Sequence, residues 1–213
     1  MALIRLILLV LLARPIARFM TGADVIGREH LPRRGPAIIA ANHNSHIDTL
    51  LLLTIFPPHL MRLLRPAAAA DYFLRDAFIG WFSRELVGIV PVERAMAGSG
   101  ADVLAPMREA LSQGAIVILF PEGTRGGADD EMGELKGGIA RLAEAFPEAP
   151  VVPIWIEGAG RVLPKGAMLP VPMNCTVLVG EAVPPAADRH EFLASLRERL
   201  LALKAEAPPQ RWR

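Results

Sequence analysis

Short apolar runs that alternate with helical patterns constrain the fold of this chain more than any other feature. Runs with the length and composition of buried strands occur at residues 36–41, 60–69, 88–94, 115–120, 151–156 and 175–179. Helical patterns occur at residues 49–55, 103–113 and 137–146, and again from residue 188 onward. Parallel strands need crossover connections, which are usually helices. The alternation therefore predicts an α/β fold with a largely parallel central sheet flanked by helices.

Three further stretches have weaker patterns. Residues 25–34 carry several charges and are predicted to be a solvated loop, with contact to anionic lipid as the alternative. Residues 71–82 are apolar and aromatic, which favours a place in the core over a membrane-facing surface. Residues 158–172 are rich in glycine and proline and are predicted to be a surface loop.

Composition limits the classes of protein to be considered. A length of 213 residues is typical of one domain with a full hydrophobic core. The net charge of +1 gives no support for binding to nucleic acid. The single cysteine, Cys175, excludes an intrachain disulfide and lies in a strand-like run, where we expect it to be buried. Because no Cys/His spacing typical of a metal site occurs, we predict no metal. We also predict no cofactor.

The N-terminal segment is apolar and carries arginines. Its longest apolar run, residues 6–13, is much shorter than the ~20 residues of a transmembrane helix. A signal peptide, a core helix and an interfacial anchor are three possible interpretations. Arg14 and Arg18 follow the apolar run closely, which argues against cleavage there. We predict that residues 1–24 form an amphipathic, membrane-associating helix, followed by one domain at residues 25–213.

The polar turn at residues 42–48 joins a predicted strand to a predicted helix. His43 and Asp48 stand five positions apart across this turn. An imidazole can remove a proton from a hydroxyl near neutral pH, and a carboxylate behind it can hold one tautomer. Alternatively, Asp48 caps the helix and His43 is an ordinary turn residue. The spacing alone leaves both interpretations open.

A second group of residues is suited to binding an anion. Gly123 could offer a backbone N–H group, and Arg125 could bind a phosphate through two hydrogen bonds. Arg94 is the last residue of another predicted strand, and Lys136 precedes a predicted helix. Each cation could instead form a surface ion pair or be solvated. Together they favour an anion pocket near His43.

Four segments resemble, in order, the four sequence blocks of the glycerolipid acyltransferases, most closely the bacterial 1-acylglycerol-3-phosphate acyltransferases. The segments are His43-x-x-x-x-Asp48, Gly88-Ile-Val-Pro-Val-Glu-Arg94, Phe120-Pro-Glu-Gly-Thr-Arg125 and Val151-Val-Pro-Ile154. The first and third are the most specific. The second is looser than the family pattern, and the fourth depends mainly on Pro153.

The resemblance implies a reaction and roles for individual residues. A fatty acyl group would move from an acyl thioester of coenzyme A or acyl carrier protein to the free hydroxyl of 1-acylglycerol-3-phosphate, making phosphatidic acid. His43 would act as general base, oriented by Asp48, without an acyl-enzyme intermediate. The residues implied to bind the acceptor are Arg94, Glu122, Gly123, Thr124, Arg125 and Lys136.

The resemblance also implies partners and a location. The partners would be the thioester donor, a lysophospholipid acceptor and a membrane surface. The protein would be monotopic at the cytoplasmic face of the inner membrane. Two alternatives remain: the same chemistry on another lysophospholipid, a lyso-ornithine lipid or a glycolipid, or a non-catalytic lipid-binding protein.

Overall fold

In the described part of the chain, the strands form a seven-stranded sheet that organises the fold. The computed structural model describes residues 6–45, 47–69, 87–92, 102–123, 132–162 and 171–208. The sheet order is β1-β7-β6-β2-β5-β3-β4. The strands are β1 (Asp24–Ile26), β2 (Ala37–Ala41), β3 (Leu64–Ala69), β4 (Val90–Val92), β5 (Ile116–Leu119), β6 (Val151–Glu157) and β7 (Thr176–Val179). Neighbours pair in parallel except β6 and β7, which are antiparallel. The predicted α/β fold with a largely parallel sheet is confirmed.

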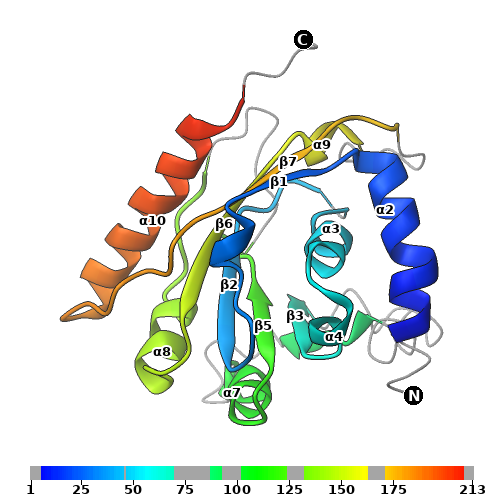
Figure 1. Ribbon diagram of the computed structural model, residues 1–213. Coiled ribbons are helices and arrows are strands. Elements are labelled where there is room, and N and C mark those ends of the chain that lie inside the picture. Colours follow the sequence, from blue (N-terminus) through cyan, green and yellow to red (C-terminus); the bar gives the residue numbers. More distant parts are fainter. Residues whose placement is uncertain are drawn as a thin grey trace.

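Helices cover both faces of this sheet. They are η1 (Leu9–Ala13), α2 (Arg14–Thr21), η2 (Arg28–His30), α3 (Ile47–Ile55), α4 (Pro58–Met61), α7 (Ala105–Ser112), α8 (Gly138–Ala145), α9 (Ala159–Val162) and α10 (Arg189–Glu206). Figure 1 shows α2, α3 and α4 on one side of the sheet and α8 and α10 on the other. Ile39 of β2 packs in the core on the α3 side, whereas its neighbour Ile38 packs on the α10 side. Both faces of the central strand are therefore buried, as is usual in parallel sheets.

Local sequence signals explain where two of the helices end or begin. α3 ends at Ile55, just before a pair of prolines, which cannot continue a helix. α10 follows Asp188, whose side chain accepts a hydrogen bond of 2.8 Å from the backbone N–H of Glu191. Phe192, Leu196 and Leu200 lie on one side of α10 and are buried. These side chains attach α10 to the sheet.

Three expectations about connecting segments were wrong or incomplete. Residues 25–34 do not form only a loop, because β1 and the 3₁₀ helix η2 extend into them and β1 pairs with β7. The strand predicted at residues 60–69 begins at Leu64, because Pro58 starts the short helix α4 ahead of it. The predicted surface loop at 158–172 contains α9, whose Ala159 and Val162 are buried in the core. Residues 71–82 lie outside the described part of the chain.

The N-terminal segment is helical from residue 6 to Thr21, and its last residue, Asp24, already begins β1. Leu9 and Ala17 are buried, and α2 packs beside α3. The opposite side exposes large apolar side chains, which are Ile7, Leu11, Leu12, Ile16 and Phe19. Among the described residues, no helix combines the length and apolar character that crossing a membrane requires.

Candidate active site

The turn after β2 brings His43 and Asp48 into contact. Nδ1 of His43 lies 3.0 Å from Oδ2 of Asp48, which is fully buried in the first turn of α3. The same carboxylate oxygen accepts hydrogen bonds from the backbone N–H groups of Asn44, at 2.7 Å, and Ser45, at 2.8 Å. Because an ionised carboxylate only accepts hydrogen bonds, this contact favours the tautomer with the proton on Nδ1. Nε2 is then the basic nitrogen of the ring.

A second contact fixes the plane of the imidazole. The His43 ring stacks on Phe120, with ring centroids 4.1 Å apart and an angle of 22° between the planes. The His43 side chain keeps 19% of its surface exposed. Within the described residues, Nε2 has no hydrogen-bond partner. The ring is therefore held by one face and one nitrogen, which leaves the other nitrogen to accept a proton.

Glu122 connects the turn after β5 to the His43 turn. One carboxylate oxygen accepts from the backbone N–H of His43 at 3.3 Å, and the other accepts from Gly133 N–H at 2.8 Å. The Glu122 side chain is buried. Its charge is satisfied by main-chain donors that lie far apart in the sequence, so it fixes the relative positions of two segments.

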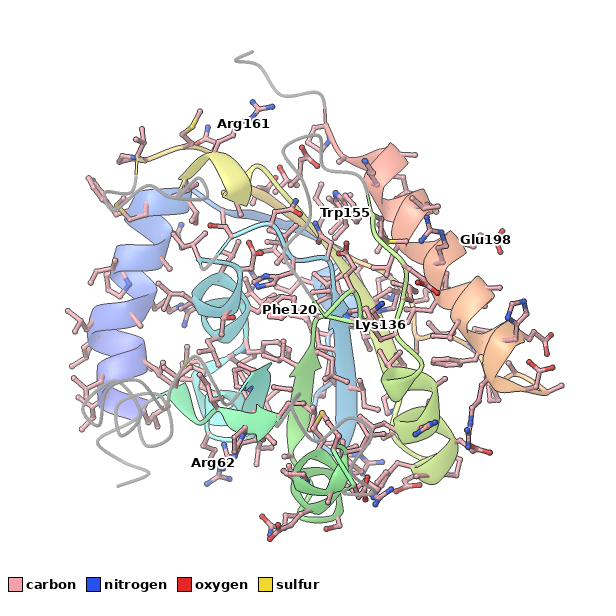
Figure 2. All side chains as sticks on the ribbon, turned by 180° about the vertical axis from the view of Figure 1, so that it is seen from behind. Arg62, Phe120, Lys136, Trp155, Arg161 and Glu198 are labelled. Carbon is pink, nitrogen blue, oxygen red and sulfur yellow. The ribbon has the colours of Figure 1, made fainter. Side chains whose placement is uncertain are left out.

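Gly123 and Lys136 lie next to each other at the carboxyl end of β5. Gly123 adopts a left-handed φ of 73°, and its N–H donates to the Phe120 carbonyl at 2.9 Å. The N–H of Lys136 donates to the Pro121 carbonyl at 2.8 Å. A Cβ at Gly123 would lie 3.6 Å from Cγ of Lys136. Figure 2 labels Phe120 and Lys136 in this region.

The Lys136 ammonium is largely solvated. Its side chain is 65% exposed, and Nζ lies 3.9 Å from a carboxylate oxygen of Glu134. The residue directly precedes Gly137, the N-cap of α8. A cation in this position can approach an anion that enters from solvent.

Asn42 has a structural use that the sequence did not reveal. Its side-chain nitrogen donates to the Ile156 carbonyl at 2.9 Å, and its side-chain oxygen accepts from Ile156 N–H at 2.6 Å. Because Ala41 is already paired with Ile154, the amide continues the β2–β6 pairing by one step. The Asn42 side chain therefore anchors the start of the His43 turn to β6.

Three of the candidate binding residues, Arg94, Thr124 and Arg125, lie outside the described part of the chain. They follow β4 and β5, whose parallel pairing through β3 puts their carboxyl ends at the same edge of the sheet as that of β2. Among the described residues, no three His, Cys, Asp or Glu side chains converge in a way that would hold a metal ion.

Comparison with known proteins gives the family. The family model described as Acyltransferase matches residues 22–157, which is more than half of the sequence. The chain belongs to the acyltransferase family. The resemblance found in the four sequence blocks is thereby confirmed. The match includes both the His43 turn and the Glu122 turn, and it ends at the last residue of β6.

Relatives of this acyltransferase-family chain carry a more specific name. A 1-acyl-sn-glycerol-3-phosphate acyltransferase of Chlamydomonas reinhardtii is 34% identical over 188 residues, which are 87% of this chain and 53% of the relative. The protein of that name from Pseudomonas aeruginosa is 30% identical over 185 residues, covering 86% of this chain and 67% of the relative. A third, LPAT1 of Arabidopsis thaliana, is 34% identical and is covered to 38%. The chain spans about half the length of the curated relatives that it matches.

A solved structure shares the fold of this acyltransferase-family chain. The 1-acyl-sn-glycerophosphate (LPA) acyltransferase PlsC from Thermotoga maritima superposes with a TM-score of 0.71 and 22% sequence identity. The superposition covers 98% of this chain and 88% of that chain. At this level of identity, the likeness concerns the fold.

Proposed function

We propose that this chain transfers a fatty acyl group from an acyl thioester to the free hydroxyl of 1-acylglycerol-3-phosphate, making phosphatidic acid. The observation that carries the proposal is the 3.0 Å contact between His43 and Asp48, which favours a basic Nε2. The names of the relatives support the choice of acceptor. Coenzyme A or acyl carrier protein would supply the thioester.

The arrangement supports direct transfer. His43 Nε2 removes the hydroxyl proton as the alcohol oxygen attacks the thioester carbonyl, so that a C–O bond forms and the C–S bond breaks. The thiolate leaves and takes the proton from the imidazolium. Asp48 stabilises the imidazolium between these steps, because its charge lies against Nδ1. The reaction is balanced without a cofactor.

The acceptor phosphate would bind beside this base. Lys136 and the main chain at Gly123 lie in the segment that Glu122 connects to His43. We assign phosphate contacts to Lys136 together with Arg94, Thr124 and Arg125, as the family resemblance implies. The resemblance also implies a role for Gly123; because its N–H already donates to the Phe120 carbonyl, we propose that this role is to form the tight turn. Glu122 contributes by orienting this segment. Cations and N–H groups around a phosphate are a common solution to its recognition.

The His43→Ala variant tests the chemistry. With acyl-CoA and 1-acylglycerol-3-phosphate, release of free thiol should slow by about 10²–10⁴-fold, the usual contribution of a general base. His59→Ala is the matched control, because His59 is exposed and lies on α4, away from the turn after β2. Circular dichroism verifies that both variants fold. Full activity in His43→Ala would exclude the mechanism.

A panel of lipid acceptors tests the substrate. Lys136→Ala should raise KM for 1-acylglycerol-3-phosphate several-fold, while KM for a lyso-ornithine lipid or a glycolipid should change little. Equal effects on all acceptors would argue against a phosphate contact at Lys136. Lipid binding without any consumption of thioester would favour the non-catalytic alternative.

We further propose that residues 1–24 attach the protein to the cytoplasmic face of the inner membrane. The exposed apolar side chains of η1 and α2 support this location, and so do the two basic residues of α2, Arg14 and Arg18. Both substrates of the proposed reaction carry acyl chains, so a membrane surface would be the natural source of the acceptor.

A further inference from the structure

The loop at residues 132–136 leads into Lys136 and is attached to the candidate site at two points. Gly133 N–H donates to Glu122, and Lys136 N–H donates to the carbonyl of Pro121. Met132 and Leu135 are buried in the same core cluster as Leu196 and Leu200 of α10. The loop 132–136 therefore lies between the end of β5 and the C-terminal helix.

Arg197 of α10 reaches this loop. Its Nη1 donates to the Gly133 carbonyl at 2.8 Å, and its Nη2 donates to the Met132 carbonyl at 3.4 Å. Within the described residues, Arg197 forms no ion pair, because no carboxylate oxygen lies within 4.0 Å of its guanidinium nitrogens. The planar guanidinium, with several fixed donors, is suited to bind two successive carbonyls in this way.

The peptide group between Met132 and Gly133 lies between two opposite charges. Its N–H points to the Glu122 carboxylate, and its carbonyl accepts from the Arg197 guanidinium. Each charge stabilises the end of the peptide dipole that it faces, and such chains of hydrogen bonds strengthen one another. Because the second Glu122 oxygen accepts from His43 N–H, the chain of contacts runs from α10 to the His43 turn.

The main chain at Gly133 lies so close to the Glu122 carboxylate that there is little space for a side chain at this position. A Cβ on Gly133 would lie 3.2 Å from Oε2 of Glu122, so a side chain there would push the carboxylate away. A displacement of the loop would therefore move both Glu122 and Lys136.

We infer that Arg197 is a positioning residue: it holds the loop 132–136 in place, and through Glu122 it holds the main chain of His43. The consequence for acceptor binding rests on the proposed function. Arg197 lies beyond residues 22–157, the segment matched by the family, so this support comes from the C-terminal helix. The guanidinium touches no reacting atom and acts only through the loop.

Arg197→Met tests the inference, because methionine keeps an apolar stem and removes the guanidinium. Arg189→Met is the matched control, since Arg189 lies on the same helix and pairs with Glu144 of α8 instead. Amide hydrogen exchange in residues 132–136 should become about tenfold faster or more in Arg197→Met and stay unchanged in Arg189→Met, because only the first variant loses hydrogen bonds to this loop.

Kinetics supply the second measurement. Arg197→Met should raise KM for the acceptor several-fold and leave KM for the acyl donor unchanged. A general loss of stability would instead lower the amount of active enzyme, and thus the maximal rate, and would leave both KM values unchanged. Unchanged exchange in the loop would overturn the inference. Faster exchange with an unchanged acceptor KM would overturn the link to acceptor binding.

The outcome stays separate from the proposed function. If the wild-type protein consumes no thioester with any acceptor of the panel, the proposed function fails. The rate of amide hydrogen exchange at His43 then still tests the inference. A faster rate in Arg197→Met supports the connection from α10 to the His43 turn, and an unchanged rate overturns it.

Discussion

Asp48 concentrates three hydrogen-bond donors on one buried oxygen atom. Oδ2 accepts from the His43 ring and from two backbone N–H groups, whereas Oδ1 has no hydrogen-bond donor within the described residues. The donors that converge on Oδ2 offset the cost of burying the charge. The side chain thus shapes the turn and orients the imidazole at the same time, so the capping and catalytic interpretations of Asp48 are compatible.

Asp48→Asn separates charge from shape. An asparagine fits the same volume, but it carries no charge to stabilise an imidazolium and can present an N–H group to Nδ1, which would favour the wrong tautomer. We expect kcat to fall by about 10²–10⁴-fold. Steady-state thiol release measures this effect, with circular dichroism to verify folding. A kcat close to that of the wild type would mean that the carboxylate charge is not used.

Cys175 offers a chemical probe of the folded core. The side chain is 2% exposed, and burial raises the pKa of its thiol to about 12, with smaller contributions from the negative charges of Asp48 and Glu157. At pH 8 only about one thiol in 10⁴ would be ionised, and the thiolate is the reactive form. We predict very slow labelling by a thiol reagent in buffer and rapid labelling of one thiol in denaturant. Fast labelling of the folded protein would contradict the burial.

Residue-scale prediction from the sequence succeeded where a side chain pairs with a close neighbour. The spacing of His43 and Asp48 alone left a capping role open. The resemblance to the acyltransferase blocks led us to expect that Asp48 orients His43, and the two side chains are in contact. The same sequence could not show that Glu122 would bind the N–H groups of His43 and Gly133, because backbone donors have no signature in the sequence. Arg197 was missed for the same reason, since both of its acceptors are carbonyls from a distant loop.

At the scale of elements, α3 connects the site to the core. Seven of its nine residues are buried, including Asp48 in its first turn. Its apolar side chains pack against the sheet and the N-terminal helices, so the direction of α3 determines where Asp48 lies. Apolar residues on nearly all sides of a helix indicate such a buried position.

Leu52→Ala and Leu50→Ala compare two positions of this helix. Leu52 is fully buried, whereas Leu50 is only partly buried. We expect Leu52→Ala to lower the free energy of unfolding by about 2–5 kcal/mol, because it leaves a cavity. Leu50→Ala should cost clearly less. Urea denaturation measures both values, and equal losses would show that α3 is less tightly packed than the structure indicates.

Elements with few long-range contacts were the hardest to predict. β2 and β5 are apolar along their whole length and were found from the sequence, because their burial comes from both faces of the sheet. β1 has only three residues, two of them exposed, and β7, the strand with which it pairs, lies about 150 positions away. Three residues are too few to show the alternation typical of a strand. The sequence therefore could not reveal β1, which is held in the sheet by its pairing with β7.

At the scale of the whole molecule, the parallel sheet explains why distant blocks of sequence meet. β2 lies between β5 and β6, and parallel pairing puts the carboxyl ends of all three at one edge. The His43 turn, the Glu122 turn and Ile156 are therefore neighbours. The alternation of strands and helices predicted the parallel direction, but it could not specify the strand order, because local patterns carry no information about which strands pair.

The N-terminal segment belongs both to the core and to the surface of the molecule. Deleting residues 1–20 would remove Leu9 and Ala17, which are buried. Such a deletion would expose the core beneath α2, and the exposed core could itself bind lipid. Substitutions on the outer side of the helix are the cleaner experiment.

The double variant Leu11→Ser, Phe19→Ser tests membrane attachment without disturbing the core. These side chains are 71% and 77% exposed, so the fold should be unaffected. Each buried large apolar side chain is worth about 1.5–3 kcal/mol of transfer free energy, so the double variant should weaken binding to anionic liposomes by at least about a hundredfold. Leu201→Ser on α10, where the leucine is 40% exposed, is the control and should still sediment with the liposomes. If the double variant sediments as fully as this control, the outer side of η1 and α2 is not the surface that meets the membrane.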